Sequence, residues 1–204
     1  KYTRLDRKTR HAADMYINVL EQLGVTDVAN HGLHIETCKE WNDEVFRFYE
    51  SQGVMPRDKI IGFNIGSAVP EKRWPAERFA DVADYFGNKG YKTVFFGGPM
   101  DLDMVKPVVE QMKTSPIVAT GAFKLGPLAA AMKWCDLLIT NDSGPMHVAI
   151  SQGVPIVALY GPSNPFFYGP YQAKSIVLES MDHYEIGKSM KQVIKEGKYK
   201  GISV

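Results

Sequence analysis

The chain has 204 residues, of which 45% are hydrophobic and 23% are charged, as expected for a globular protein. Its net charge of +1 predicts no general attraction for nucleic acid. Only two cysteines are present, Cys38 and Cys135, which argues against a disulfide framework and favours a reducing compartment. No apolar run approaches the roughly 18 residues that a membrane span needs, and no signal peptide is visible.

The first quarter of the chain lacks a regular strand and helix pattern. Residues 1–10 are basic and aperiodic, and we expect a linker there. Apolar spacing predicts helices over 12–23 and 38–52, with a loop or short strand over 25–36. We therefore expect 1–58 to be a helical appendage that packs on the main domain or joins it to another. Because the chain begins with Lys1 rather than methionine, we expect it to be a piece of a longer protein.

From residue 59 onwards, short apolar strands alternate with helices of about ten residues. The predicted strands are 60–65, 91–96, 117–119, 136–140, 154–160 and 175–178. The predicted helices are 76–88, 102–112, 125–134 and 145–153. This alternation indicates a parallel sheet with helices on both faces, so we expect an α/β, Rossmann-like domain over 59–180.

The tail over 181–204 is rich in lysine. Its lysines are Lys188, Lys191, Lys195, Lys198 and Lys200. A solvated tail is the simpler interpretation, and weak contact with an anionic membrane surface is the alternative.

The most informative segment follows the strand at 136–140. It reads Asn141-Asp142-Ser143-Gly144, and Pro145 then begins a helix. Free N–H groups at such a helix start face the crevice beyond the strand, where a phosphate or diphosphate binds. We therefore predict that this turn holds the diphosphate of a nucleotide sugar.

Three side chains of this segment have candidate roles. Asp142 or Ser143 should cap the helix whatever the function. His147 lies in the first turn, close to any bound diphosphate, although a lone histidine is often structural. Ser143 is not a predicted hydrolase nucleophile, because Asn-Asp-Ser-Gly-Pro is not G-x-S-x-G.

The turn after the first predicted strand also suits a phosphate. Gly66 lets a ligand approach the backbone, Ser67 supplies a hydroxyl, and Lys72 and Arg73 supply positive charge. The alternative is that Lys72 and Arg73 are an exposed, solvated pair before a helix that Trp74 begins.

The turn after the second predicted strand carries glycines and acids. Asp101 and Asp103 follow Gly97-Gly98-Pro99 and could accept hydrogen bonds from ribose hydroxyls. The alternative is that both acids serve only the start of the next helix. The turn does not match G-x-G-x-x-G, which weakens a dehydrogenase interpretation.

Four segments resemble the C-terminal half of the heptosyltransferases, glycosyltransferase family 9, in order and spacing. They are 71–79, 97–99, 141–147 and 159–165. The resemblance implies a two-domain GT-B architecture, in which the C-terminal domain binds the donor, usually ADP-L-glycero-D-manno-heptose. It also implies that the N-terminal domain binds the lipopolysaccharide-core acceptor and supplies the catalytic aspartate. The catalytic residue of this chain therefore stays unknown, with the base expected in the missing N-terminal domain.

Carried over by position, the resemblance implies a set of donor-binding residues. Ser67 and Lys72 would contact the diphosphate, and Asp101 or Asp103 would meet the ribose. Phe123 or Lys124 lies where the backbone grips the adenine. The residues around the diphosphate and the heptose would be Asp142, Ser143, Gly144 and His147.

The resemblance implies an inverting transfer of heptose to the lipopolysaccharide inner core. No clustered metal-ligand set is visible, so we expect neither a metal nor a cofactor, and lysine, helix dipole and N–H groups would stabilise the leaving group. Expected partners are the nucleotide-sugar donor and, through the missing domain, the lipopolysaccharide-core acceptor. We expect a cytoplasmic protein, peripheral to the cytoplasmic face of the inner membrane if the tail makes its contact. The alternatives are a nucleotide-sugar-binding module without catalysis and a Rossmann oxidoreductase.

Overall fold

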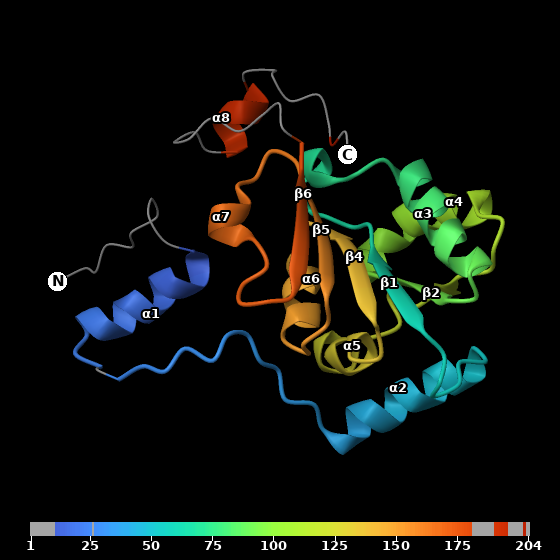
Figure 1. Cartoon of the computed structure of the whole chain (residues 1–204), viewed down its shortest axis with the longest axis horizontal. Helices are drawn as coiled ribbons and strands as arrows, with labels where there is room; N and C mark the ends of the chain where they lie inside the picture. Colours follow the sequence, from blue (N-terminus) through green and yellow to red (C-terminus); the bar gives the residue numbers. More distant parts are fainter. Residues whose placement is uncertain (1–10, 26, 181–189, 196–201, 203–204) are drawn as a thin grey trace.

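The computed structural model describes residues 11–25, 27–180, 190–195 and 202. In this part of the chain six strands form one parallel sheet in the order β3-β2-β1-β4-β5-β6 (Figure 1). The strands are β1 (Ile60–Asn64), β2 (Lys92–Phe96), β3 (Ile117–Val118), β4 (Leu137–Asn141), β5 (Ile156–Tyr160) and β6 (Ser175–Glu179). The predicted α/β class and parallel sheet are confirmed.

Helices flank the sheet on both faces. The α-helices are α1 (Ala12–Gln22), α2 (Lys39–Ser51), α3 (Ala76–Asn88), α4 (Leu102–Gln111), α5 (Leu125–Met132), α6 (Gly144–Ile150), α7 (Pro165–Tyr168) and α8 (Met190–Lys195). Two short 3₁₀ turns, η1 (Pro70–Lys72) and η2 (Pro99–Asp101), precede α3 and α4. The predictions missed α7, because four residues carry no helical periodicity. Its start is fixed locally by the Asn164 side chain, which accepts a hydrogen bond from the Phe166 N–H at 2.8 Å.

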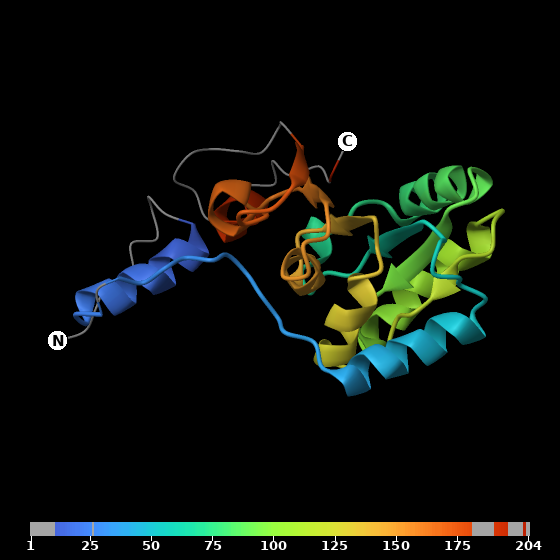
Figure 2. The same ribbon diagram turned by 60° about the horizontal axis from the view of Figure 1, so that its bottom comes forward.

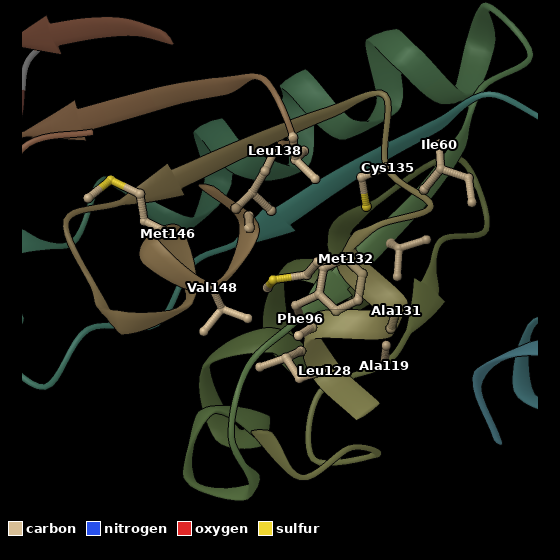
Figure 3. Packing of buried hydrophobic residues seen from close by; sticks show 14 of the residues in the cluster. Ile60, Phe96, Ala119, Leu128, Ala131, Met132, Cys135, Leu138, Met146 and Val148 are labelled. Atoms are coloured by element: carbon tan, nitrogen blue, oxygen red, sulfur yellow. The ribbon is translucent and has the colours of Figure 1, made fainter. Parts of the chain in front are cut away.

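The core has two layers because successive strand residues face opposite sides of the sheet. Ile60, Phe96 and Leu138 face one way and join α2, α5 and α6, as Figure 3 shows around Met132. Ile61 and Phe63 face the other way, toward α3 and α4. Every residue of β1 is buried, as expected for a central strand covered on both faces.

The two helices of the first quarter are attached differently. α2 packs tightly on α5, because Trp41 lies so close to Gly126 that a Cβ there would be 2.5 Å from the indole. Tyr49 of α2 is fully buried and its hydroxyl donates to the Ala131 carbonyl at 3.1 Å. α1 lies apart from the sheet at the end of an extended segment (Figure 2).

Polar contacts at the first turn of α1 hold this helix near the segment after α7. His11 stacks on Tyr171 with ring centroids 4.5 Å apart and lies 3.2 Å from the Gly169 carbonyl oxygen. The Tyr171 hydroxyl also donates to Asp14 and accepts from Asn30.

The expectations for both ends of the chain fall largely outside the described residues. These include the predicted linker over 1–10 and most of the basic tail. Within the tail, α8 carries Lys191 and Lys195, both exposed, and Ile202 is buried in the core layer of α3 and α4. None of the described helices is long and apolar enough to cross a membrane.

Asp84 of α3 ties that helix to the turn after α4. Its carboxylate accepts from the Lys113 N–H at 2.8 Å, the Thr114 N–H at 2.8 Å and the Thr114 hydroxyl at 2.7 Å. Burial alone would raise the pKa of Asp84, but these hydrogen bonds outweigh it and the pKa falls below its ordinary value.

We expect Asp84→Asn to lower the free energy of unfolding at pH 7 by about 1–3 kcal/mol, since it removes charge-assisted hydrogen bonds. A depressed folded-state pKa gives stability that is present above the unfolded value of 3.8 and lost as pH falls through the folded value. The difference from wild type should therefore shrink in acid. Urea unfolding at pH 7 and pH 3 measures both, and Asp81→Asn on the exposed side of α3 is the control. A deficit that stayed constant with pH would contradict this role.

Candidate functional site

The order of strands reverses between β1 and β4. From β1 the chain proceeds to β2 and β3 on one side, and from β4 to β5 and β6 on the other. In parallel sheets a ligand crevice lies at such a switch point, outside the carboxyl ends of the strands. The turns that follow β1 and β4 are the two segments in which the sequence predicted phosphate-binding residues.

Asn141, fully buried at the end of β4, ties these two turns together. Its amide donates to the Ile65 carbonyl at 2.8 Å, and its Oδ1 accepts from the Trp74 N–H at 3.0 Å. Arg73 closes the same turn, because its Nε and Nη2 donate to the Ser67 carbonyl at 2.9 and 2.7 Å. The positive charge predicted at Arg73 therefore organises the turn from within.

Lys72 and Asp142 form an ion pair across the crevice. Lys72 Nζ lies 2.5 Å from Asp142 Oδ2, and the side chains are only 17% and 6% exposed. Ser163, from the turn after β5, donates to the same oxygen at 2.5 Å. Ser67 donates weakly to the Asp142 carbonyl at 3.4 Å. The interpretation of Lys72 as a solvated loop lysine is therefore wrong, because its ammonium is largely shielded and paired.

The predicted cap of α6 by a side chain is also wrong. Asp142 precedes the cap position and its carboxylate points to Lys72. Ser143 occupies the N-cap but its side chain makes no capping hydrogen bond. Its Oγ accepts from the Asn64 amide at 2.7 Å instead. Tertiary partners have thus outcompeted the local capping that the sequence favours.

The first turn of α6 is open on its outer side. Gly144 is exposed, and a Cβ built on it would meet nothing within 4 Å. His147 lies one turn further along. Burial lowers the pKa of His147, Asp142 opposes that change, and the electrostatic influence of His11 and Lys72 supports it. The neutral imidazole therefore predominates at pH 7.

The predicted nucleoside-binding residues lie at the β2 and β3 side of the same edge. Asp101 Oδ2 accepts from the Gly98 N–H at 2.8 Å, and its carboxylate rests against Gly66 and Gly97, where a Cβ would collide with it. Asp103 is exposed in the first turn of α4. Lys124 is exposed at the N-cap of α5, whereas the Phe123 ring packs on Phe48 at 4.9 Å.

Three residues of this site were not identified from the sequence. They are Asn64, Asn141 and Ser163, which are all buried. The sequence contains a signal for Asn64, because this residue is a polar side chain at the end of an otherwise apolar strand. Ser163 lies in the segment 159–165 that carried the family resemblance, but only the folded chain shows that its hydroxyl meets Asp142.

The arrangement is suited to binding an anion. One ammonium, two hydroxyls and the open backbone at Gly144 converge where two parallel strands end. No group of three or more His, Cys, Asp or Glu that could hold a metal ion occurs among the described residues.

A separate hollow of about 640 Å³ at the opposite end of the sheet, beside Phe46 and Trp134, includes no residue of this crevice.

Comparison with known proteins identifies the family. The model of glycosyltransferase family 9 (heptosyltransferase) matches residues 2–200. This chain belongs to glycosyltransferase family 9. Its Rossmann-like sheet and its similarity to enzymes of lipopolysaccharide biosynthesis agree with the resemblance found in the sequence.

The relatives are longer than this chain. Lipopolysaccharide heptosyltransferase 2 of Escherichia coli K12 is 34% identical over 130 residues, which cover 61% of this chain and 37% of that protein. A solved family 9 glycosyltransferase from Veillonella parvula is 79% identical with a TM-score of 0.92, covering 98% of this chain and 58% of the other. The E. coli ADP-heptose heptosyltransferase II structure is 27% identical with a TM-score of 0.65, covering 80% and 51%. The chain described here thus spans about half the length of these relatives.

We expect Lys72→Met to lower the free energy of unfolding by about 2–4 kcal/mol, because it leaves the Asp142 carboxylate buried without its counter-ion. The double variant Lys72→Met/Asp142→Asn should recover much of that loss. Lys39→Met, which breaks the exposed Lys39–Asp43 pair, is the control and should matter far less. Urea denaturation measures all three. Equal losses in Lys72→Met and Lys39→Met would mean that the crevice pair is no more shielded than the surface pair.

We expect His147 to titrate below its ordinary value of 6.5 in an NMR pH titration. Because the unfolded chain takes up the proton more readily, the stability linked to His147 is present above 6.5 and is lost as pH falls toward the folded value. Asp142→Asn should lower the pKa further, and Lys72→Met should raise it, since each removes a neighbouring charge. Shifts of the opposite sign in these variants would show that His147 does not sense the ion pair.

Proposed function

We propose that this chain is the donor-binding half of an inverting, metal-independent heptosyltransferase, which transfers heptose from ADP-heptose to the lipopolysaccharide inner core. The observation that carries the proposal is the shielded Lys72 ammonium at the β1–β4 switch point, beside the open backbone of Gly144. A diphosphate is the ligand that this combination suits. The relatives are heptosyltransferases named for lipopolysaccharide and for ADP-heptose, which supports the choice of sugar and acceptor.

The chemistry follows from the leaving group. When the bond between the anomeric carbon and the diphosphate breaks, negative charge grows on the phosphate oxygen that held the sugar. Lys72 would stabilise that charge directly, and the Gly144 N–H would add a preorganised dipole. Because α6 has only seven residues, the fixed charge of Lys72 is the main contribution. The hydroxyls of Ser67 and Ser143 would orient the diphosphate by exchanging their long bonds to the Asp142 and Asn141 carbonyls, at 3.4 and 3.3 Å, for phosphate oxygens.

Asp142 would serve the sugar end of the donor. A carboxylate is an acceptor for sugar hydroxyls, and Ser163 and Lys72 already hold this one in a single position. His147, kept neutral by its surroundings, can donate or accept a hydrogen bond beside the diphosphate without adding a charge.

The nucleoside would extend from the diphosphate toward β2 and β3. Gly98 leaves room beside the backbone, because only Asp101 Oδ2 lies within 4 Å of a Cβ built there. Asp101 stands at the ends of β1 and β2, where it could exchange its bond to Gly98 for a ribose hydroxyl. Met100 and Leu125 are largely exposed on this side and offer an apolar surface to a base. Backbone groups near Lys124 would contact the edge of the base. Asp103, which is exposed in the first turn of α4, is the alternative to Asp101 for the ribose contact.

The acceptor and the catalytic base would come from the remaining half of the longer protein. Deprotonating the acceptor hydroxyl needs a base within hydrogen-bond reach of it. Within the crevice Asp142 already accepts hydrogen bonds from Lys72 and Ser163, so we do not assign it the role of this base. We propose that the whole protein works in the cytoplasm at the inner-membrane surface, where its lipid-linked acceptor lies, and that Lys191 and Lys195 add a weak contact there.

We expect the isolated chain to bind ADP more tightly than UDP or GDP, without added magnesium. The reason is that Lys72 neutralises the diphosphate while the segment from Gly97 to Lys124 selects the base. Isothermal titration calorimetry in buffer containing EDTA measures the three affinities. Equal affinities, or binding that requires a divalent ion, would contradict the proposal.

Gly144→Ala is the matched variant for this titration. A methyl group there meets no protein atom within 4 Å, so the free energy of unfolding should not fall. A diphosphate against the Gly144 backbone would collide with it, and ADP affinity should drop at least tenfold. Unchanged affinity would show that the diphosphate does not lie at the start of α6.

A further inference from the structure

Asn64 ends β1 at the switch point and is fully buried. Its Nδ2 group donates to Ser143 Oγ at 2.7 Å and to Thr140 Oγ1 at 3.2 Å, and lies 3.3 Å from the Gly66 carbonyl oxygen. A single buried amide therefore links the end of β1 to the residues on both sides of the β4 turn.

The directions of these hydrogen bonds are mutually consistent. A serine or threonine hydroxyl has only one proton to donate. Thr140 donates its proton to the Asn141 carbonyl at 2.7 Å, and Ser143 donates to the same carbonyl at 3.3 Å. Both hydroxyls are thus left as acceptors for the Asn64 amide. Ser143 Oγ is held between Asn64 and Asn141 in one orientation.

This orientation removes Ser143 from its usual task. A serine at an N-cap normally accepts from an N–H two or three residues along the helix. Pro145 has no N–H, so the Met146 N–H is the target that remains. It donates to the Ser143 backbone carbonyl at 3.2 Å, and Ser143 Oγ does not bond to it. Asn64 and the Asn141 carbonyl therefore hold the hydroxyl away from the N–H groups of α6.

Asn64 also carries an unfavourable feature that packing alone would not select. Its Oδ1 is buried and has no hydrogen-bond partner within the described part of the chain. A buried acceptor without a partner is destabilising, and an apolar side chain such as those along β1 would avoid it. A role in the ligand site explains why an amide stands there.

We propose that Asn64 is a positioning residue for donor binding, which acts through Ser143. It occupies the acceptor side of Ser143 Oγ, so that the hydroxyl proton, which goes to the Asn141 carbonyl at 3.3 Å without a ligand, can be donated to a diphosphate oxygen instead. This inference rests on the proposed function, because it assigns Asn64 to the same diphosphate site.

The test is a double-mutant cycle on ADP affinity, measured by calorimetry on the full 204-residue chain. Asn64→Leu, which fills the space of the amide, should weaken ADP binding roughly 3- to 10-fold, the value of one misplaced hydrogen bond. Ser143→Ala should weaken it by a similar factor. In the Ser143→Ala background, Asn64→Leu should have no further effect, because no hydroxyl remains to be positioned.

Thr140→Val is the matched control. It keeps the side-chain volume and removes the other hydroxyl that Asn64 contacts, so it disturbs the same buried network without touching Ser143. We expect it to lower the melting temperature but to leave ADP affinity within twofold of wild type. Asn64→Ser, which keeps a small polar group, replaces Asn64→Leu in the cycle if the leucine variant does not fold.

A second readout needs no ligand. Once released from residue 64, Ser143 Oγ should turn to cap α6. The Met146 N–H, which in the wild type bonds to the Ser143 carbonyl at 3.2 Å, would gain this second acceptor and should exchange more slowly with solvent in the Asn64 variant. Slower exchange that disappears in the double variant supports the link between the two residues.

Each alternative result is decisive. Affinity losses that multiply in the double variant, or a Thr140→Val loss as large as that of Asn64→Leu, would overturn the positioning role and leave the proposed function intact. Absence of ADP binding by the wild-type chain would overturn the proposed function and this inference together.

Discussion

The shielded ion pair between Lys72 and Asp142 is the interaction around which the crevice is organised. Lys72 lies at the end of η1, in the turn after β1, and Asp142 lies in the turn after β4, so the pair joins the two sides of the sheet's switch point. A carboxylate that is 6% exposed needs a partner to stay ionised. Ser163 adds a third strand end to the same oxygen. The pair and Ser163 thus link the turns after β1, β4 and β5, and they place an ammonium at the crevice.

Around this pair the structure favours ligand geometry over local stability. Ser143 makes no capping bond to α6, Asn64 buries an acceptor without a partner, and Gly144 stands at a position where the fold itself would accept a larger residue. Each of these features is neutral or unfavourable for folding. Their concentration at one strand edge distinguishes the crevice from the hollow beside Trp134, where no comparable set converges.

Other buried or capping polar groups of the chain serve the fold itself. Asp84 binds three donors in the turn after α4, Asn164 caps α7, and Tyr49 donates to a carbonyl in α5. These contacts stabilise the scaffold on which the crevice is built.

Much of this protein was determined by the sequence itself. Apolar runs of strand length alternating with amphipathic helices specify a parallel sheet, and the helix over 76–88 was predicted with its observed bounds. The turns after β1 and β4 were also identifiable, because Gly66, Ser67, Asp142 and Gly144 are residues that strands and helices reject. These signals are local, and each depends only on a residue and its near neighbours along the chain.

The tertiary structure alone decided which of these residues meet. Lys72 and Asp142 are 70 positions apart, and Asn64 and Ser143 are 79, so no periodicity could pair them. The sequence predicted Lys72 as a phosphate contact and Ser143 as a helix cap or donor contact, but it indicated a partner within the fold for neither. Only the parallel pairing of β1 with β4 brings an ammonium to a carboxylate and a hydroxyl to an amide. Those long-range hydrogen bonds and charges are stronger than the local cap, and they set the geometry of the site.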